Sequence, residues 1–128
     1  MSGNEEKNVL IVDDMQAMRA MAKSVVTSLG ANVVGEAENG EQGLELYRSE
    51  KPDLVLLDIE MPVKDGISTL KAILAEDANA NIVMLTSVDN MAVVEDCIFS
   101  GARDYIRKDV SPEVIRERLE KELDKIGE

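Results

Sequence analysis

Short apolar segments alternate with segments of helical periodicity along this chain, and this alternation limits the folds open to it. Each apolar segment is rich in Val, Ile or Leu and bounded by polar residues, which is typical of strands in a parallel sheet. The predicted strands are 8–13, 32–37, 53–58, 82–86 and 104–107. Because a helical pattern follows each of them, we expect right-handed crossovers. Five units are too few for an eight-unit barrel, so the pattern predicts an open, doubly wound α/β sheet.

Residues that favour helix ends support this division of the chain. Gly30 suits the C-terminal end of the first helix and Asn39 precedes the second. Ser111 followed by Pro112 suits the start of the last helix. The apolar side chains at helical spacing in the fourth helix are Met91, Val94 and Ile98. We expect the methionines to fill gaps in the core.

Composition excludes several classes of function. The 128 residues suit one domain over 1–128, with 1–6 expected to be a short frayed tail. The net charge of −12 opposes nucleic-acid binding, and no apolar stretch approaches the roughly 20 residues of a membrane span. The absence of histidine excludes Ser-His-Asp and Cys-His catalysis. The single cysteine, Cys97, cannot form an intramolecular disulfide, which fits a reducing compartment such as the cytoplasm.

Three aspartates follow two of the predicted strands. Asp13 and Asp14 end the apolar run 9–12, and Asp58 ends the run 54–57. Open α/β sheets bind ligands outside the carboxyl ends of their strands, so these carboxylates should meet at one edge. Two carboxylates about 4 Å apart repel by roughly 4 kcal/mol at an effective dielectric of about 20. A divalent cation, or a proton, would remove that cost.

Thr86 and Lys108, at the ends of two further strands, would add a hydroxyl and an ammonium to the same edge. Mg²⁺ prefers one or two carboxylates together with waters and phosphate oxygens. An aspartate can act as a nucleophile toward phosphorus. A metal, a lysine and a hydroxyl on the phosphoryl oxygens would supply the charge neutralisation that phosphoryl transfer needs. The set is chemically complete for forming an acyl phosphate on one aspartate without histidine.

Four segments give the chain a strong resemblance to the receiver domain of two-component response regulators, the CheY-like family. They occur in the order and at the separations of the family, and the resemblance covers about Lys7 to Leu123. The segments are Leu10-Ile11-Val12-Asp13-Asp14-Met15, 57–66, Leu85-Thr86-Ser87 and 101–108. The resemblance implies a parallel five-stranded sheet of strand order 2-1-3-4-5 with five flanking helices, a flavodoxin-like arrangement for which CheY is itself a standard example.

The resemblance also implies roles for individual residues. Asp58 would be the phosphoacceptor. Asp13 and Asp14 would hold Mg²⁺, together with an oxygen of Asp58 and the backbone carbonyl of Glu60. Thr86 would hydrogen-bond the phosphoryl group.

Lys108 would pair with the phosphoryl group, but the residue after it departs from the family pattern. The family usually has proline there, often preceded by a cis peptide bond, whereas this chain has Asp109. A non-proline cis bond costs about 3–4 kcal/mol, so we expect a trans peptide and a turn of different shape. Asp109 is also expected to compete with phosphate for Lys108.

The implied function is signalling. A histidine kinase or phosphotransfer protein would phosphorylate Asp58 with Mg²⁺ present, and the phosphate would bias two conformations. In the family switch, Thr86 would move toward the phosphate and the ring of Tyr105 would turn inward. An output protein would dock on the face formed by the fourth helix, the fifth strand and the fifth helix. The domain would act as a monomer or as a phosphorylation-dependent dimer. The segment 12–19 is similar to chemotaxis-type receivers.

Two other classes of function compete with this interpretation. A haloacid-dehalogenase-type phosphatase also uses an aspartate nucleophile at a strand end. That class commonly has Asp-x-Asp, whereas Asp13 and Asp14 are adjacent here, and it usually has a larger core. A receiver fold that binds partners without phosphorylation is the third candidate, and the intact Asp58, Thr86 and Lys108 argue against it.

Overall fold

The computed structural model describes residues 7–126, so the tail expected at 1–6 lies outside the described residues. Its five parallel strands are hydrogen-bonded in the order β2-β1-β3-β4-β5. The predicted open, doubly wound α/β fold is confirmed. In chain order the elements are β1 (Asn8–Val12), α1 (Gln16–Ser28), β2 (Asn32–Ala37), α2 (Gly40–Glu50), β3 (Leu54–Leu57), α3 (Gly66–Glu76), β4 (Ile82–Thr86), α4 (Met91–Ser100), β5 (Asp104–Arg107) and α5 (Pro112–Lys125).

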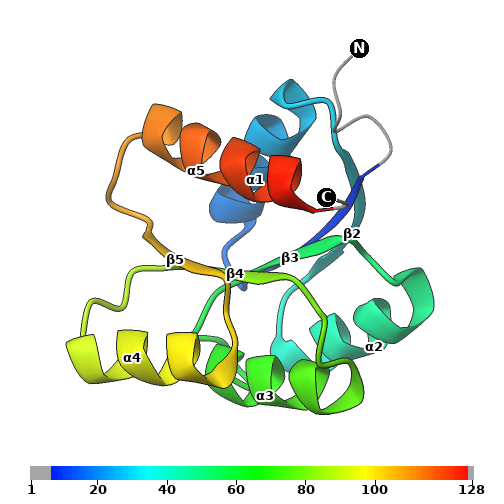
Figure 1. Ribbon diagram of the computed structural model, residues 1–128, viewed down its shortest axis with the longest axis vertical. Coiled ribbons are helices and arrows are strands. Elements are labelled where there is room, and N and C mark those ends of the chain that lie inside the picture. Colours follow the sequence, from blue (N-terminus) through cyan, green and yellow to red (C-terminus); the bar gives the residue numbers. More distant parts are fainter. Residues whose placement is uncertain (1–6, 127–128) are drawn as a thin grey trace.

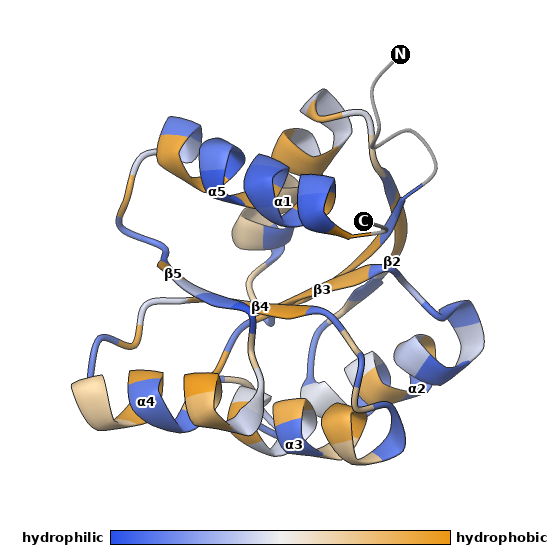
Figure 2. Ribbon diagram, viewed as in Figure 1, coloured by the Kyte–Doolittle hydropathy of each residue, from blue (hydrophilic) through white to orange (hydrophobic). Residues whose placement is uncertain are grey.

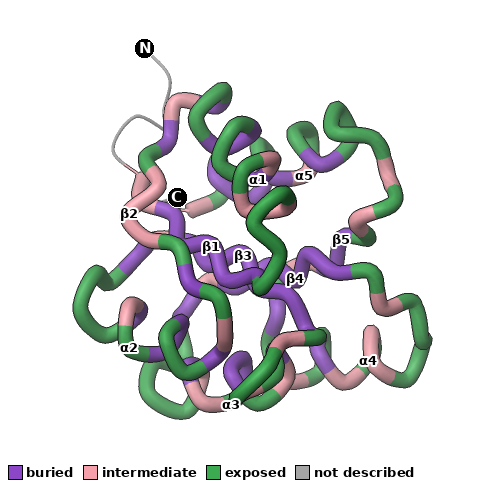
Figure 3. Tube along the Cα trace, turned by 180° about the vertical axis from the view of Figure 1, so that it is seen from behind, coloured by how far each residue is buried: buried purple, intermediate pink, exposed green. Residues whose placement is uncertain are grey.

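Alternate strand residues enter two separate apolar layers. In β1, Val9 and Ile11 pack in the layer that includes α1 and α5, whereas Leu10 and Val12 pack in the layer that includes α2 and α3. Figure 1 shows α1 and α5 on one side of the sheet and α2, α3 and α4 on the other. The central strands are therefore covered on both faces, and Figure 3 shows them as buried. This explains their continuous apolar runs.

The helix ends follow the capping residues. The side chain of Asn39 accepts a hydrogen bond of 2.9 Å from the backbone of α2, and Ser111 caps α5 in the same way, with Pro112 in the first turn. Gly30 has a φ of +84° directly after α1, the left-handed conformation that ends many helices. The sequence therefore predicted these boundaries through local chemistry.

The packing of α4 differs from the prediction. Only Cys97 is fully buried in this helix, whereas Met91 is 67% exposed, Ile98 45% and Phe99 88%. The expectation that the methionines fill the core is therefore wrong for Met91, and it is also wrong for Met15, which is 53% exposed. The hydropathy colouring of Figure 2 shows apolar residues along α4. Several of these apolar side chains are exposed to solvent rather than packed against the sheet.

The strand register determines which residues meet at the carboxyl edge. Val12 of β1 pairs with Leu57 of β3, and Leu57 pairs with Met84 of β4. Thr86 pairs with Arg107 of β5. The residues that follow these strands are consequently neighbours in space although they lie far apart in the sequence.

Candidate functional site

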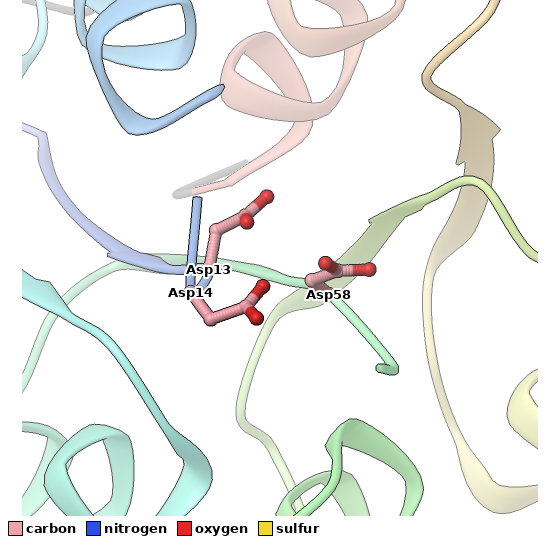
Figure 4. Close-up of side chains that lie close together, drawn as sticks. All are labelled: Asp13, Asp14 and Asp58. Carbon is pink, nitrogen blue, oxygen red and sulfur yellow. The ribbon is translucent and has the colours of Figure 1, made fainter. Parts of the chain in front are cut away.

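The three aspartates lie together at this edge. Each contributes one carboxylate oxygen to a group in which all the oxygens lie within 4.8 Å of one another. Figure 4 shows Asp13 and Asp14 at the end of β1, beside Asp58 at the end of β3. Asp13 and Asp58 are 4% and 5% exposed, whereas Asp14 is exposed. The acidic group is therefore accessible to solvent at Asp14 and buried at the other two positions.

Contacts from β2 and α1 fix the turn that carries Asp13. Its N–H donates to the carbonyl of Ala37 at 3.0 Å, and its Oδ1 accepts from the N–H of Met15 at 2.9 Å. Arg19 donates to the carbonyl of Asp13 at 2.8 Å. The Arg19 side chain is 12% exposed and lies 3.6 Å from Glu36. The backbone of Asp13 is thus held on two sides.

Lys108 bridges two of the aspartates. Its ammonium lies 2.8 Å from Asp13 and 2.9 Å from Asp58, and its side chain is 8% exposed. Burial opposes the charged ammonium, but the two carboxylate contacts outweigh burial and raise the pKa of Lys108. Burial raises the pKa of Asp13, and the hydrogen bond from Lys108 offsets part of that rise. Lys108 thus supplies positive charge to an acidic group that remains rich in negative charge.

The turn after Lys108 forms without the proline usual in the family. No peptide bond among residues 7–126 is cis, so the bond to Asp109 is trans, as expected. The carboxylate of Asp109 binds Arg107 at 2.6 Å. Its competition with a phosphoryl group for Lys108 stays a prediction. The N–H of Lys108 donates to the carbonyl of Thr86 at 2.9 Å. Pairing between β4 and β5 therefore extends to the lysine.

The loop after β3 packs tightly against Asp58. The Oδ1 atom of Asp58 accepts a hydrogen bond of 2.7 Å from the N–H of Ile59. A Cβ atom on Gly66 would lie 1.9 Å from the carbonyl oxygen of Asp58, so the loop leaves no room for a larger residue. Glu60 is exposed beside the site. Gly66, which the sequence pattern marks only as part of a turn and a helix start, thus constrains the backbone of Asp58.

The chemistry of this donor set fits Mg²⁺. Hard divalent cations select oxygen ligands, and Mg²⁺ is usually held by one or two carboxylates together with waters and phosphate oxygens. The grouped oxygens of Asp13, Asp14 and Asp58 provide such ligands, with Asp14 accessible from solvent. A cation there would also relieve the repulsion among the carboxylates.

Thr86 and Tyr105 meet at the backbone of Val88. Thr86 is fully buried, and its Oγ1 accepts a hydrogen bond of 3.3 Å from the N–H of Val88. The hydroxyl of Tyr105 donates to the carbonyl of Val88 at 2.6 Å. Tyr105 as a whole residue is 9% exposed, and burial raises its pKa to about 12. The two residues expected to form a switch are thereby connected through one residue of the β4–α4 loop.

Comparison with known proteins places the chain in a family. The family model of the response regulator receiver domain matches residues 9–120. The chain belongs to the response regulator receiver family. It is 43% identical over 115 residues to the chemotaxis protein CheY of Thermotoga maritima, covering 90% of this chain and 96% of that protein. It is 44% identical over 115 residues to CheY of Bacillus subtilis, with the same shares covered.

A solved receiver structure has the same fold. The crystal structure of the CheX–CheY–BeF3–Mg²⁺ complex from Borrelia burgdorferi matches with a TM-score of 0.87 and 33% identity, covering 90% of this chain and 87% of that chain. Receiver domains are signalling modules rather than enzymes with a separate substrate, so the phosphatase alternative is not favoured. None of the helices described over residues 7–126 combines the length and the apolar character that crossing a membrane requires.

Two residues shape this receiver site in ways that the sequence pattern did not predict. Arg19 contacts the turn after β1, and Val88 joins Thr86 to Tyr105. The spacing of Arg19 from the acidic pair was a usable signal, because six residues along a turn and helix can return a long side chain toward its start. The position of Val88 after Thr86 predicts an effect of its side chain on access to the phosphoryl group, whereas the contacts with Thr86 and Tyr105 are made by its backbone N–H and carbonyl.

Proposed function

We propose that this receiver domain accepts a phosphoryl group on Asp58 from a phosphohistidine of a histidine kinase or phosphotransfer protein. The single observation that carries the proposal is the convergence of three carboxylates and the ammonium of Lys108 at one edge of the sheet. Asp13, Asp14 and Asp58 would hold Mg²⁺, together with the backbone carbonyl of Glu60. The bound metal would neutralise charge on the phosphoryl oxygens.

The chemistry follows from the position of Asp58. One of its carboxylate oxygens attacks phosphorus while the phosphorus–nitrogen bond of the donor breaks, and the bonding electron pair remains on the imidazole nitrogen. The product is an acyl phosphate. Lys108 already contacts Asp58 and would pair with a phosphoryl oxygen, and the Thr86 hydroxyl would bond another. Attack of water on the same phosphorus would restore the carboxylate, so the domain would catalyse only its own phosphorylation and dephosphorylation.

The switch would work through the β4–α4 loop. Movement of Thr86 toward a phosphoryl group would disturb its hydrogen bond with Val88, and Val88 also accepts from Tyr105. The phosphate would then favour one position of the Tyr105 ring over another. These contacts support Thr86 and Tyr105 as the switch pair.

The output face would be formed by α4, β5 and α5. Apolar side chains stand exposed on this face, at Met91 and Ile98 of α4 and Val114 of α5. They support docking of an output protein, with the domain acting as a monomer or as a phosphorylation-dependent dimer. The similarity to chemotaxis proteins supports a chemotaxis-type receiver, and the free, buried Cys97 fits a location in the cytoplasm.

Intact-mass measurement tests the phosphoacceptor. After incubation with acetyl phosphate and Mg²⁺, the protein should gain one phosphoryl group, and chelation of the metal with EDTA should prevent the gain. Asp58→Asn should abolish it, whereas Asp89→Asn, which removes an exposed carboxylate of the β4–α4 loop, should retain it. No gain in the unmodified protein, or an equal gain in Asp58→Asn, would contradict the proposal.

A further inference from the structure

The peptide groups of Tyr105 are held by side chains rather than by a neighbouring strand. β5 lies at an edge of the sheet, and polar groups on such an edge need other partners. The N–H of Tyr105 donates to Oδ1 of Asp104 at 2.8 Å. Its carbonyl accepts from Nη2 of Arg118 at 3.1 Å. One residue of β5 and one of α5 therefore satisfy both backbone groups of Tyr105.

Arg118 and Asp104 also bind each other. Nε of Arg118 donates to Oδ2 of Asp104 at 3.0 Å, and Nη2 donates to Oδ1. A two-point contact between a guanidinium and a carboxylate restricts orientation more than a single bond does. The two side chains are 38% and 24% exposed, so the pair is partly shielded from solvent. The pair and the Tyr105 backbone form one closed set of hydrogen bonds.

The opposite end of Tyr105 is fixed as well. Its hydroxyl bonds the carbonyl of Val88 at 2.6 Å, and Val88 is tied to Thr86. A hydroxyl bond at the tip of the ring depends on where the strand places the Cα atom. The contacts on the Tyr105 backbone therefore influence whether the ring can reach Val88.

We infer that Arg118 and Asp104 are positioning residues that hold Tyr105 with its ring turned inward against Val88. Through them α5 is connected to Thr86 by way of Tyr105 and Val88. The link between this arrangement and phosphorylation rests on the proposed function. The claim that Arg118 and Asp104 hold the Tyr105 ring inward does not depend on that function. The sequence gives no direct signal for the arrangement, because Arg118 lies 14 residues from Asp104.

Tyrosine fluorescence tests the position of the ring. The protein has two tyrosines and no tryptophan, so Tyr47→Phe leaves Tyr105 as the only strong emitter. In that background Arg118→Met removes the donors, and Arg116→Met is the matched control, because Arg116 lies on the same helix and contacts Ser28. Loss of one ordinary hydrogen bond shifts a two-state population by roughly fivefold. We expect acrylamide to quench Tyr105 about twofold or more strongly in Arg118→Met than in Arg116→Met.

Two further variants keep the test decisive if Arg118→Met fails to fold. Arg118→Lys keeps the positive charge but loses the two-point contact, so it should show intermediate quenching. Asp104→Asn weakens the pair from the other side and should also raise quenching. Quenching equal to that of Arg116→Met in every folded variant would overturn the inference.

Intact mass then tests the link to phosphorylation. At a fixed, subsaturating concentration of acetyl phosphate with Mg²⁺, Arg118→Met should reach a lower steady-state phosphorylated fraction than Arg116→Met, because the inward ring and the phosphate favour the same conformation. Equal fractions would overturn this link. Absence of phosphorylation in the unmodified protein would instead contradict the proposed function, and the fluorescence comparison would still decide the role of Arg118.

Discussion

Lys108 donates a hydrogen bond from its ammonium to the carboxylate of Asp58 across 2.9 Å, and the same ammonium lies 2.8 Å from Asp13. One buried ammonium group therefore contacts two of the three grouped carboxylates and partly neutralises their charge. A metal ion bound by these aspartates would supply charge of the same sign. The lysine and the metal are thus expected to contribute overlapping stabilisation to the fold.

Replacement of Lys108 should make the stability of the protein depend on metal. Lys108→Met keeps a long side chain but leaves the buried carboxylates without a protein cation, which should lower the free energy of unfolding by about 3 kcal/mol in EDTA. Because Mg²⁺ binds the folded state, it should restore part of that loss and raise the melting temperature more than in the unmodified protein. Thermal unfolding followed by circular dichroism, with EDTA or Mg²⁺, measures both effects.

Lys121→Met provides the control for this experiment, since Lys121 is an exposed lysine of α5. It should leave both the stability and the response to Mg²⁺ close to those of the unmodified protein. A response to Mg²⁺ that is the same in Lys108→Met and Lys121→Met would contradict the overlap between lysine and metal.

Gly66→Ala should damage the site through the backbone of Asp58. The new Cβ would lie 1.9 Å from the carbonyl oxygen of Asp58 and 2.7 Å from Cα of Ile59, so the loop must move. We expect a loss of about 2 kcal/mol in urea denaturation and a weaker stabilisation by Mg²⁺. Gly35→Ala is the control, because its Cβ would meet only side-chain carbons of Leu10 and Leu46, at 3.3 Å. A Gly66→Ala protein as stable as Gly35→Ala would show that the loop yields without cost.

Val63, in the loop between β3 and α3, is expected to store backbone strain. Its φ is +68°, unusual for a β-branched residue, and the N–H of Lys64 donates to the carbonyl of Pro62 at 2.7 Å, which closes a tight three-residue turn. Val63 is 82% exposed, so removing its side chain takes little apolar surface out of the folded core. Val63→Gly should therefore stabilise the fold by about 1 kcal/mol in urea denaturation. The control is Val114→Gly, the same change in the first turn of α5, which should destabilise the fold. If both substitutions changed the free energy of unfolding in the same direction, the strain at Val63 would be contradicted.

The sequence was sufficient where local chemistry and strand topology decide the structure. Asp13, Asp14 and Asp58 could be brought together from the sequence because each follows an apolar strand, and parallel strands present their carboxyl ends at one edge. The exposure of each aspartate depends on the direction of its side chain, and so does the contact between Lys108 and Asp13. The spacing of residues along the sequence does not encode these directions. The exposed Met91 on α4 was missed because helical spacing identifies a stripe but does not say which way the stripe faces.

Stability should fall as the pH rises above about 10, because two buried tyrosines resist ionisation. Burial is the main cause that raises the pKa of Tyr105 to about 12, and burial followed by the 2.8 Å bond to Asp77 raises the pKa of Tyr47. An unfolded tyrosine ionises near pH 10. Above that value the folded state keeps protons that the unfolded chain releases, so rising pH favours unfolding until the folded groups ionise as well.

Urea denaturation between about pH 8 and 11 measures this dependence. Tyr47→Phe removes one of the two buried phenols and its bond to Asp77, so it should lower stability at neutral pH. Because phenylalanine cannot ionise, the same variant should lose less stability per pH unit above about pH 10 than the unmodified protein does. The raised pKa of Lys108 acts in the same direction in both proteins, since a protonated lysine is also lost as the pH rises, and it cancels from the comparison. Identical slopes would mean that Tyr47 ionises equally readily in the folded and unfolded states.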